Sequence, residues 1–132
     1  MSSEETFDLA AAGLRGDGSE LARSLEVLAG KLEAALPGRA RVERHGGGLL
    51  GRGEKRVRQV LVDLGVGTSG VRYQLDVDRD RAECFRERKV GGIAIKRESL
   101  DPSSWIAALT DDLRAEAERS AEARAALDRL LL

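Results

Sequence analysis

The chain has 132 residues, a formal net charge of −1 and 42% hydrophobic residues, a balance typical of one globular domain. Its single cysteine, Cys84, excludes a disulfide within the chain. No stretch has the pattern of a signal peptide or of a membrane-spanning helix. We therefore expect one cytoplasmic domain over residues 1–132.

Charge is distributed unevenly along the chain. Residues 1–35 contain seven acids and three bases, and residues 98–132 contain eight acids and four bases. Residues 39–58, in contrast, contain seven bases and two acids. Two explanations are open: the segments neutralise each other on folding, or the basic middle forms an exposed face for an anionic partner.

A leucine stripe predicts a helix over residues 18–36. Its members recur every three or four residues, as on one face of a helix. They are Leu21, Leu25, Leu28, Leu32 and Ala35. Asp17 followed by Glu20 resembles a capping box at its start, and Pro37–Gly38 ends it. The preceding residues 1–16 predict either a short helix or a loose N-terminal arm.

Short alternating segments then predict an antiparallel sheet. Turn residues separate the segments, and no connection is long enough for a parallel crossover. We expect a meander of four or five strands, over residues 39–45, 55–64, 71–77, 82–87 and 93–96. The segment 55–64 has apolar residues on both faces, which indicates either a central strand or a β-bulge near Arg58.

The C-terminal region has the clearest helix signature. Asp101 is a favourable N-cap, and Pro102 stands at the first helical position, where its missing N–H is not needed. No glycine or proline interrupts residues 103–132, so we expect one helix about 45 Å long. A compact domain of this size is on the order of 36 Å across. We therefore expect the part over about 115–132 to overhang, and a homodimer to form through residues 105–132.

These elements predict an α+β fold, in which an N-terminal helix and a long C-terminal helix flank an antiparallel four- to five-stranded meander. Motifs for cofactors are incomplete in it. Gly46, Gly48 and Gly51 have the spacing of a dinucleotide fingerprint, but a strand follows them instead of a helix. We expect no cofactor.

Metal and catalytic motifs are incomplete as well. The acids Asp76, Asp78, Asp80 and Glu87 have the spacing of a calcium loop, but Arg81 stands where that loop needs glycine. A strand that ends in a solvated turn explains these acids better. The only histidine has no serine or cysteine near it in sequence, so we expect no metal site, no catalytic residue and no enzyme.

The strongest positive signal is the basic hairpin over residues 39–58. Its glycine-rich turn combines two leucines at the apex with arginines at the base, and arginine favours phosphate oxygens through bidentate pairing. The candidate partner-binding residues are Arg39, Arg41, Arg44, Leu49, Leu50, Arg52, Lys55, Arg56 and Arg58. A solubilising hairpin with a mobile tip is the alternative that needs no partner.

The segment 89–105 and the opening of the first helix, residues 20–26, resemble small uncharacterised proteins of high-GC actinobacteria. This resemblance implies no activity and no functional residue. The order helix, short meander, long helix is also similar to that of nucleoid-associated dimers of the YbaB/EbfC type. That likeness is one of element order only, with no shared motif.

The expected function is a non-catalytic protein-interaction or adaptor module that self-associates and acts on a protein partner. The alternative is an anion-binding module that uses the 39–58 hairpin for nucleic acid or an anionic membrane surface. Aromatic residues make up only 3% of the chain, which speaks against stacking on bases. Two leucines offer only a few kcal/mol at a membrane.

Overall fold

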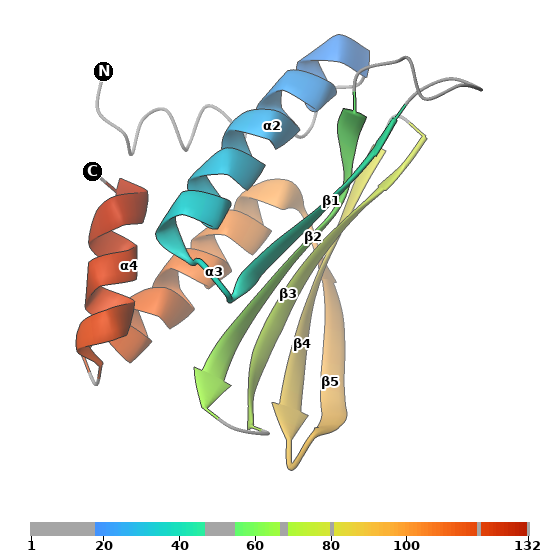
Figure 1. Ribbon diagram of the computed structural model, residues 1–132. Helices are drawn as coiled ribbons and strands as arrows, with labels where there is room; N and C mark the ends of the chain where they lie inside the picture. Colours follow the sequence, from blue (N-terminus) through green and yellow to red (C-terminus); the bar gives the residue numbers. More distant parts are fainter. Residues whose placement is uncertain (1–17, 47–54, 67–68, 80, 119, 132) are drawn as a thin grey trace.

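The computed structural model of the chain describes residues 18–46, 55–66, 69–79, 81–118 and 120–131. A five-stranded antiparallel sheet carries helices on one of its faces (Figure 1). The order of strands across the sheet is their order along the chain, so each strand pairs only with its sequence neighbours. The α+β fold with an antiparallel meander is thus confirmed.

One helix precedes the sheet and two follow it. The elements are α2 (Gly18–Ala35), β1 (Ala40–Gly46), β2 (Lys55–Val66), β3 (Ser69–Asp78), β4 (Arg81–Val90), β5 (Ile93–Leu100), α3 (Pro102–Ala117) and α4 (Ala121–Leu131). The first predicted helix and all five predicted strands are confirmed within a few residues at each end. The expected helix or arm over residues 1–16 lies outside the described residues.

The core fills the space between the helices and one face of the sheet. Alternation along each strand turns apolar side chains toward the helices, while the other face of the sheet is polar. The largest fully buried side chains are Trp105, Tyr73, Leu28, Leu32, Leu75, Leu109, Leu113 and Leu130. Trp105 packs edge-on against Tyr73, with ring centroids 5.9 Å apart, and its indole N–H donates to the carbonyl oxygen of Phe85 at 3.0 Å.

A β-bulge places Arg58 outside the regular ladder between β1 and β2. Glu43 lies opposite Gln59, whereas the next residue, Arg44, lies opposite Val57. The extra residue reverses the alternation of β2, so Val57 joins the core with 3% of its surface exposed. Both explanations for apolar residues on the two faces of this segment are confirmed, since β2 contains the bulge and also lies between β1 and β3 in the sheet.

The start of α3 is capped as its sequence predicts. The Asp101 carboxylate accepts a hydrogen bond from the backbone N–H of Ser104 at 2.6 Å, and Pro102 is the first helical residue. This cap fixes the point where the chain leaves β5 and turns back across the sheet, so Trp105 enters the core one turn later.

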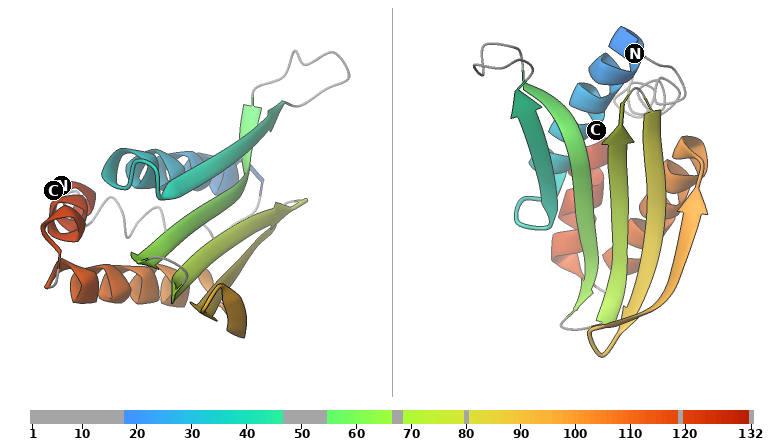
Figure 2. Two further views of the ribbon diagram at one scale, coloured as in Figure 1. Left: turned by 60° about the horizontal axis from the view of Figure 1, so that its bottom comes forward. Right: turned by 90° about the vertical axis from the view of Figure 1, so that its right-hand side faces the viewer.

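The structure corrects the prediction of one long overhanging helix. Helix α3 ends at Ala117, and α4 folds back to pack against α2 (Figures 1 and 2). The backbone N–H of Arg124 donates to the carbonyl of Ser120, so Ser120 occupies the N-cap position of α4. Folding back buries Leu130 completely, whereas a straight helix would leave it in solvent. No glycine or proline was needed for this break.

The helices cover only part of the sheet. At the end that carries the β2–β3 and β4–β5 turns, the strands project beyond the helices (Figures 1 and 2). Accordingly, every residue of β5 from Ile93 to Arg97 is exposed, whereas Leu100 at its far end packs against the core. In the described part of the chain, Ile93–Arg97 at this projecting end therefore lie outside the core.

Candidate interaction surface

The basic residues predicted as a binding site on the 39–58 hairpin fall into two groups. Two of them lie on the helix side of the sheet and form ion pairs with helices. The Arg39 Nη1 atom lies 3.0 Å from an Oε2 of Glu116, and the Arg44 Nη2 atom lies 2.6 Å from Oε1 of Glu33. Arg44 also approaches Glu26 at 3.5 Å. These two arginines hold the edge strand to the helical layer.

The other basic residues of this hairpin face solvent. Arg41, Lys55, Arg56 and Arg58 are exposed, and none of them forms an ion pair within the described residues. The remaining candidates, Leu49, Leu50 and Arg52, lie outside the described residues. Four of the nine predicted residues are therefore solvent-facing charges of one hairpin, spread along its ladder from Arg41, opposite Leu61, to Lys55, opposite Gly46.

A polar network between the sheet and α3 neutralises another arginine of the strands. The Arg86 guanidinium lies 2.9 Å from the Asp112 carboxylate, 3.2 Å from Glu98 and 3.0 Å from the Tyr73 hydroxyl. Tyr73 in turn donates a short hydrogen bond to Asp112. All four side chains are thus engaged with one another, and they lie between the sheet and a helix. The arrangement fits a role in docking α3.

The electrostatics of this network follow from burial and hydrogen bonding. Burial raises the pKa of Tyr73 well above its ordinary value, and the hydrogen bond to Asp112 raises it further. Burial opposes the charge of Arg86, but its hydrogen bonds to Tyr73 and Asp112 outweigh that effect and raise its pKa. Both groups therefore keep their protons throughout the neutral range.

The single cysteine is not poised for chemistry. Cys84 lies on the core side of β4 with 2% of its surface exposed. Burial raises the pKa of its thiol to about 12, with a smaller contribution from the negative charges of Asp101 and Asp76. A thiol that stays protonated is a poor nucleophile, so Cys84 acts here as a small apolar side chain.

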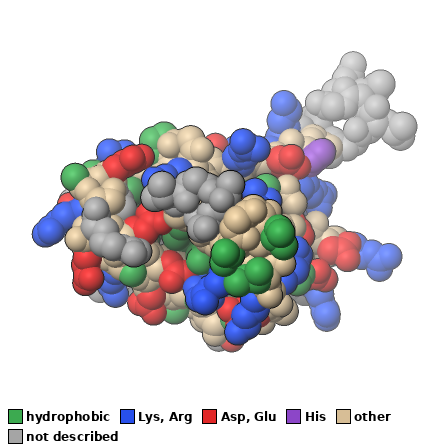
Figure 3. All heavy atoms as spheres, turned by 90° about the horizontal axis from the view of Figure 1, so that it is seen from below, with side chains coloured by type: hydrophobic (Ala, Val, Ile, Leu, Met, Phe, Trp, Pro, Cys, Tyr) green, Lys and Arg blue, Asp and Glu red, His purple; other side chains and the backbone are tan. Residues whose placement is uncertain are grey.

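The β4–β5 hairpin carries exposed apolar side chains at the projecting end of the sheet. Its turn consists of Gly91 and Gly92, whose φ angles of 61° and 80° suit a tight two-residue turn between strands. The exposed fractions are 52% for Val90, 69% for Ile93 and 58% for Ile95. Seen from this end, apolar side chains gather on the surface with lysine and arginine around them (Figure 3).

The charges beside these apolar side chains are unbalanced on the helix side of the hairpin. Arg88 lies directly opposite Lys96 in the ladder between the two strands, and both side chains are exposed. Neither forms an ion pair within the described residues. The Cβ atoms of directly opposed residues are about 5 Å apart, and like charges at such positions destabilise the ladder. We call the side chains of Arg88, Val90, Ile93, Ile95 and Lys96 the hairpin surface.

On the opposite face of the same hairpin, the basic side chains have an acidic neighbour. Glu87 lies 3.4 Å from Arg97 and 3.9 Å from Lys89. The guanidinium of Arg97 also stacks over the ring of Phe85, 4.3 Å from its centroid. The basic residues of the segment 88–97 without an ion-pair partner in the described part of the chain are therefore Arg88 and Lys96, on the helix side.

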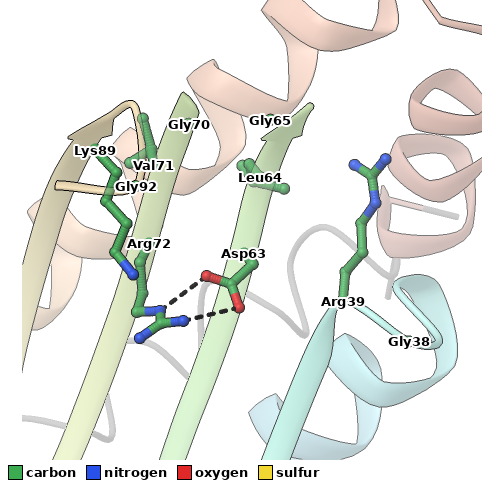
Figure 4. Close-up of a pocket in the computed structure, with 10 residues that line it drawn as sticks. All are labelled: Gly38, Arg39, Asp63, Leu64, Gly65, Gly70, Val71, Arg72, Lys89 and Gly92. Carbon is green, nitrogen blue, oxygen red and sulfur yellow. Dashed lines mark hydrogen bonds and ion pairs between the residues drawn. The ribbon is translucent and has the colours of Figure 1, made fainter. Parts of the chain in front are cut away.

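A hollow of about 390 Å³ lies at the same end of the sheet (Figure 4). It opens beside the start of β1, where the Asp63 N–H donates to the carbonyl oxygen of Arg39, the residue before β1, at 3.0 Å. Gly65 and Gly70 face each other across β2 and β3, and a side chain at Gly70 would collide with the carbonyl oxygen of Leu64. The full lining is Gly38, Arg39, Asp63, Leu64, Gly65, Gly70, Val71, Arg72, Lys89 and Gly92.

The charged groups of this hollow have partners of their own. Arg72 bonds to Asp63 at 2.8 Å, and Lys89 approaches Glu87. The side chain of Arg39 extends away from the Asp63–Arg72 pair, and it pairs with Glu116 (Figure 4). The three cations therefore do not converge on one point, and the hollow has no arrangement that would fix an anion.

The acids with calcium-loop spacing belong to a β-hairpin. Asp76 and Asp78 lie on β3 and Glu87 on β4, while Asp80 is outside the described residues. Asp76 accepts hydrogen bonds from the side-chain amides of Gln59 and Gln74, both at 2.8 Å. Within the described ranges, no three His, Cys, Asp or Glu side chains are grouped so that they could hold a metal ion.

Two further observations bear on partners. None of the described helices is both long enough and apolar enough to cross a bilayer. Comparison of the chain with protein-family models, with curated proteins and with solved structures returned no match.

Sequence reasoning placed a strand over residues 93–96 but gave it no role. A signal for the hairpin surface was present: a Gly-Gly pair flanked by Val90 and Ile93, with two basic residues on each side, Arg88–Lys89 and Lys96–Arg97. A two-residue glycine turn between apolar residues predicts a tight hairpin. What the sequence could not show was that, among the described residues, the helices leave Ile93–Arg97 of this hairpin exposed.

Proposed function

We propose that the chain is a non-catalytic interaction module that binds a protein partner at the hairpin surface. One observation carries the proposal: Val90, Ile93 and Ile95 are exposed together at the end of the sheet that projects beyond the helices. Contiguous exposed aliphatic side chains on an otherwise polar surface are typical of protein-interaction sites.

The energetic scale is compatible with a reversible contact. Complete burial of one valine or isoleucine side chain contributes about 1.5–3 kcal/mol. Since each of the three is between 52% and 69% exposed, covering them contributes roughly 3–5 kcal/mol before the cost of association. A partner must add polar or backbone contacts to this burial to form a lasting complex.

Two features support the non-catalytic part of the proposal. The Cys84 thiol is buried and its pKa is raised, which makes it a poor nucleophile. The Tyr73, Arg86 and Asp112 side chains bond to each other beneath α3 instead of lining the hollow.

The test is recovery of partner proteins from the native cell by the tagged chain and by its Ile93→Ser/Ile95→Ser variant. Both side chains are exposed, so the variant is expected to fold as the parent does. We expect it to lose the partner. Val27→Ser, on α2, is a matched control because Val27 is also an exposed aliphatic residue, at 37%. Equal recovery by the double variant and the control would contradict the proposal.

A second candidate function is anion binding by the 39–58 hairpin. It is favoured by the exposure of Arg41, Lys55, Arg56 and Arg58, which have no ion-pair partner within the described residues. Nucleic acid and anionic vesicles at low salt are the probes. We expect Arg41→Glu/Arg56→Glu/Arg58→Glu to abolish binding, and binding that survives the triple change would exclude this hairpin as the site.

We still propose self-association, although the apolar side chains predicted to form the dimer interface are not all exposed. The apolar side chains expected to form a dimer through residues 105–132 include Trp105, Leu109, Leu113 and Leu130, all of which lie in the core. The test is sedimentation at high concentration, where a monomer would contradict the homodimer.

A further inference from the structure

We propose that the free edge of β5 binds an extended peptide segment of acidic and aliphatic residues, which joins the sheet as a sixth strand. The inference rests on the proposed function, since it names the chemistry of the partner at the same hairpin. Three features of the described residues carry it: an open strand edge, aliphatic side chains beside that edge, and a positive charge with no acid to balance it.

The edge of the sheet at β5 is open. The strand pairs with β4 alone and forms the border of the sheet (Figure 2). Edge strands present unpaired N–H and C=O groups, and an extended peptide satisfies them by forming a new ladder. The exposure of all residues from Ile93 to Arg97 leaves room for such a peptide.

A bulge sets where the peptide lies along this edge. Ala94 pairs with Lys89 and Lys96 with Arg88, so Ile95 is an extra residue that stands outside the ladder. The regular stretch available for backbone pairing is therefore Lys96–Leu100. Aliphatic residues at one end of the peptide would then contact Ile93 and Ile95, while the residues that follow pair with this stretch.

The charge of the hairpin determines which peptide fits. The segment 88–97 contains four basic residues and no acidic residue. On its helix side, Arg88 lies opposite Lys96, and like charges at such positions repel each other. In the described part of the chain neither is within ion-pair distance of a carboxylate, because the neighbouring acid on this face, Glu98, pairs with Arg86. A carboxylate supplied by the peptide relieves this repulsion, so glutamate or aspartate is expected next to the aliphatic residues.

Two other partners are less suited to this surface: a second copy of the chain and an anionic lipid surface. A second copy of the chain would bring its own 88–97 segment, with the same four bases, against this one. An anionic lipid surface would balance the charge but would leave the backbone groups of the β5 edge without partners. A peptide strand of acidic and aliphatic residues would pair with the backbone groups of the edge, cover the apolar side chains and balance the positive charge.

The experiment measures binding of two labelled octapeptides to the purified chain by fluorescence anisotropy at low salt. One has the sequence Val-Thr-Val-Thr-Glu-Thr-Glu-Thr, and the other has the same residues in reverse order, so both strand directions are offered. Alternation places the valines and glutamates on one face of the peptide. We expect one of the two to bind, and we expect no binding when its glutamates are replaced by lysines.

Two variants of the protein locate the site. Arg88→Glu/Lys96→Glu is expected to weaken binding more than tenfold, because it reverses the charge that attracts the glutamates. Arg23→Glu/Arg124→Glu changes the net charge equally at two exposed arginines of α2 and α4 and is the matched control, with an expected change of less than twofold. An equal loss in both variants would overturn the β5 site and indicate general attraction between opposite charges.

Backbone methylation of the peptide tests strand addition itself. The N–H groups of a strand alternate between its two edges, so methylation at alternate residues blocks one edge at a time. We expect one methylated isomer to bind and the other to fail. Equal binding of both isomers would overturn the strand geometry.

The remaining outcomes separate this inference from the proposed function. If neither octapeptide binds while Ile93→Ser/Ile95→Ser still loses its cellular partner, strand addition is wrong and the proposed function stands. If no peptide binds, but anionic vesicles bind and Arg88→Glu/Lys96→Glu abolishes that binding, the partner of this surface is an anionic lipid surface and not a peptide. If no peptide binds, but the chain forms a dimer that Ile93→Ser/Ile95→Ser disrupts, the partner of this surface is a second copy of the chain.

Discussion

The two halves of β4 differ although they belong to one strand. Under α3, Cys84 is buried and Arg86 bonds to Asp112, Glu98 and Tyr73. Beyond the helices, Arg88 and Val90 are exposed, and Arg88 faces another cation. Spacing and composition are similar in the two halves, so the coverage by a helix accounts for the difference. Basic strand residues serve the fold where an acidic helix lies above them and are available to a partner where none does.

The same distinction applies to the β1–β2 hairpin. Arg39 and Arg44 are neutralised by acids of α3 and α2, whereas Arg41, on the other face, has no such partner in the described residues. The acidic ends and the basic middle of the chain therefore do neutralise each other, but only on the helix side of the sheet. On the other face the basic residues of this hairpin are exposed, and an anionic partner for them stays a prediction.

The largest difference in stability is expected between two aliphatic residues, one in the core and one at the projecting end. We expect Leu130→Ala to lower the free energy of unfolding by about 3 kcal/mol, because it leaves a cavity in the core. Ile95→Ala should change it by less than about 0.5 kcal/mol, since Ile95 is exposed. Urea unfolding followed by fluorescence of Trp105, the only tryptophan, measures both. A small effect at Leu130 would contradict the folding back of α4.

Two arginines of β4, Arg86 under α3 and Arg88 beyond it, allow the same comparison of stability for charged residues. Arg86→Ala removes the cation from a half-buried network and leaves Asp112 without its ion-pair partner, so we expect a loss of about 2 kcal/mol. Arg88→Ala is the matched change two residues along the strand, and we expect it to alter stability by less than about 0.5 kcal/mol. The same unfolding measurement applies, and similar losses at the two positions would show that helix coverage is not the cause.

The covered half should also show a dependence on alkaline pH. Because folding raises the pKa of Tyr73, the native state keeps a proton that the unfolded chain loses above about pH 10. Stability from this group is present below that pH and falls by about 1.4 kcal/mol per pH unit above it. Tyr73 is the only tyrosine, so tyrosinate absorbance reports its ionisation directly. We expect Tyr73→Phe to lose this part of the pH dependence.

The smallest effect should be a gain in stability at the projecting end. Arg88→Glu replaces a repulsive cross-strand pair with an attractive one opposite Lys96, which should stabilise the fold by about 0.5 kcal/mol. The gain should disappear at about 1 M salt, where exposed charges are screened. Arg88→Gln is the control, because it removes the repulsion without adding a negative charge. A loss of stability in Arg88→Glu would mean that an acid already balances this cation.

Much of the fold was predictable from local patterns. The leucine stripe of α2, the Asp101 cap and the alternation of the strands each have a short-range physical cause, and each is confirmed. The break before α4 was not predicted, because no glycine or proline marks it. Ser120 offered only a weak cap signal there, and burial of Leu130 against the rest of the core decided the outcome.

The candidate surface was less predictable than the fold. The sequence drew attention to the 39–58 hairpin because its basic residues are dense, but Arg39 and Arg44 turned out to be paired with helices. Whether Ile93 and Ile95 are buried depends on the path of α3 across the sheet, which is a tertiary property. Local alternation cannot distinguish a strand beneath a helix from one that runs beyond it.

The strand order has a consequence for the way this chain reaches its structure. Because each strand pairs with the next strand in sequence, the sheet can form by successive closure of short hairpin loops. The contact between α2 and α4, in contrast, joins segments separated by the whole sheet. Loop-closure entropy favours the short connections first, so we infer a fast-forming meander on which the two helices meet late in folding.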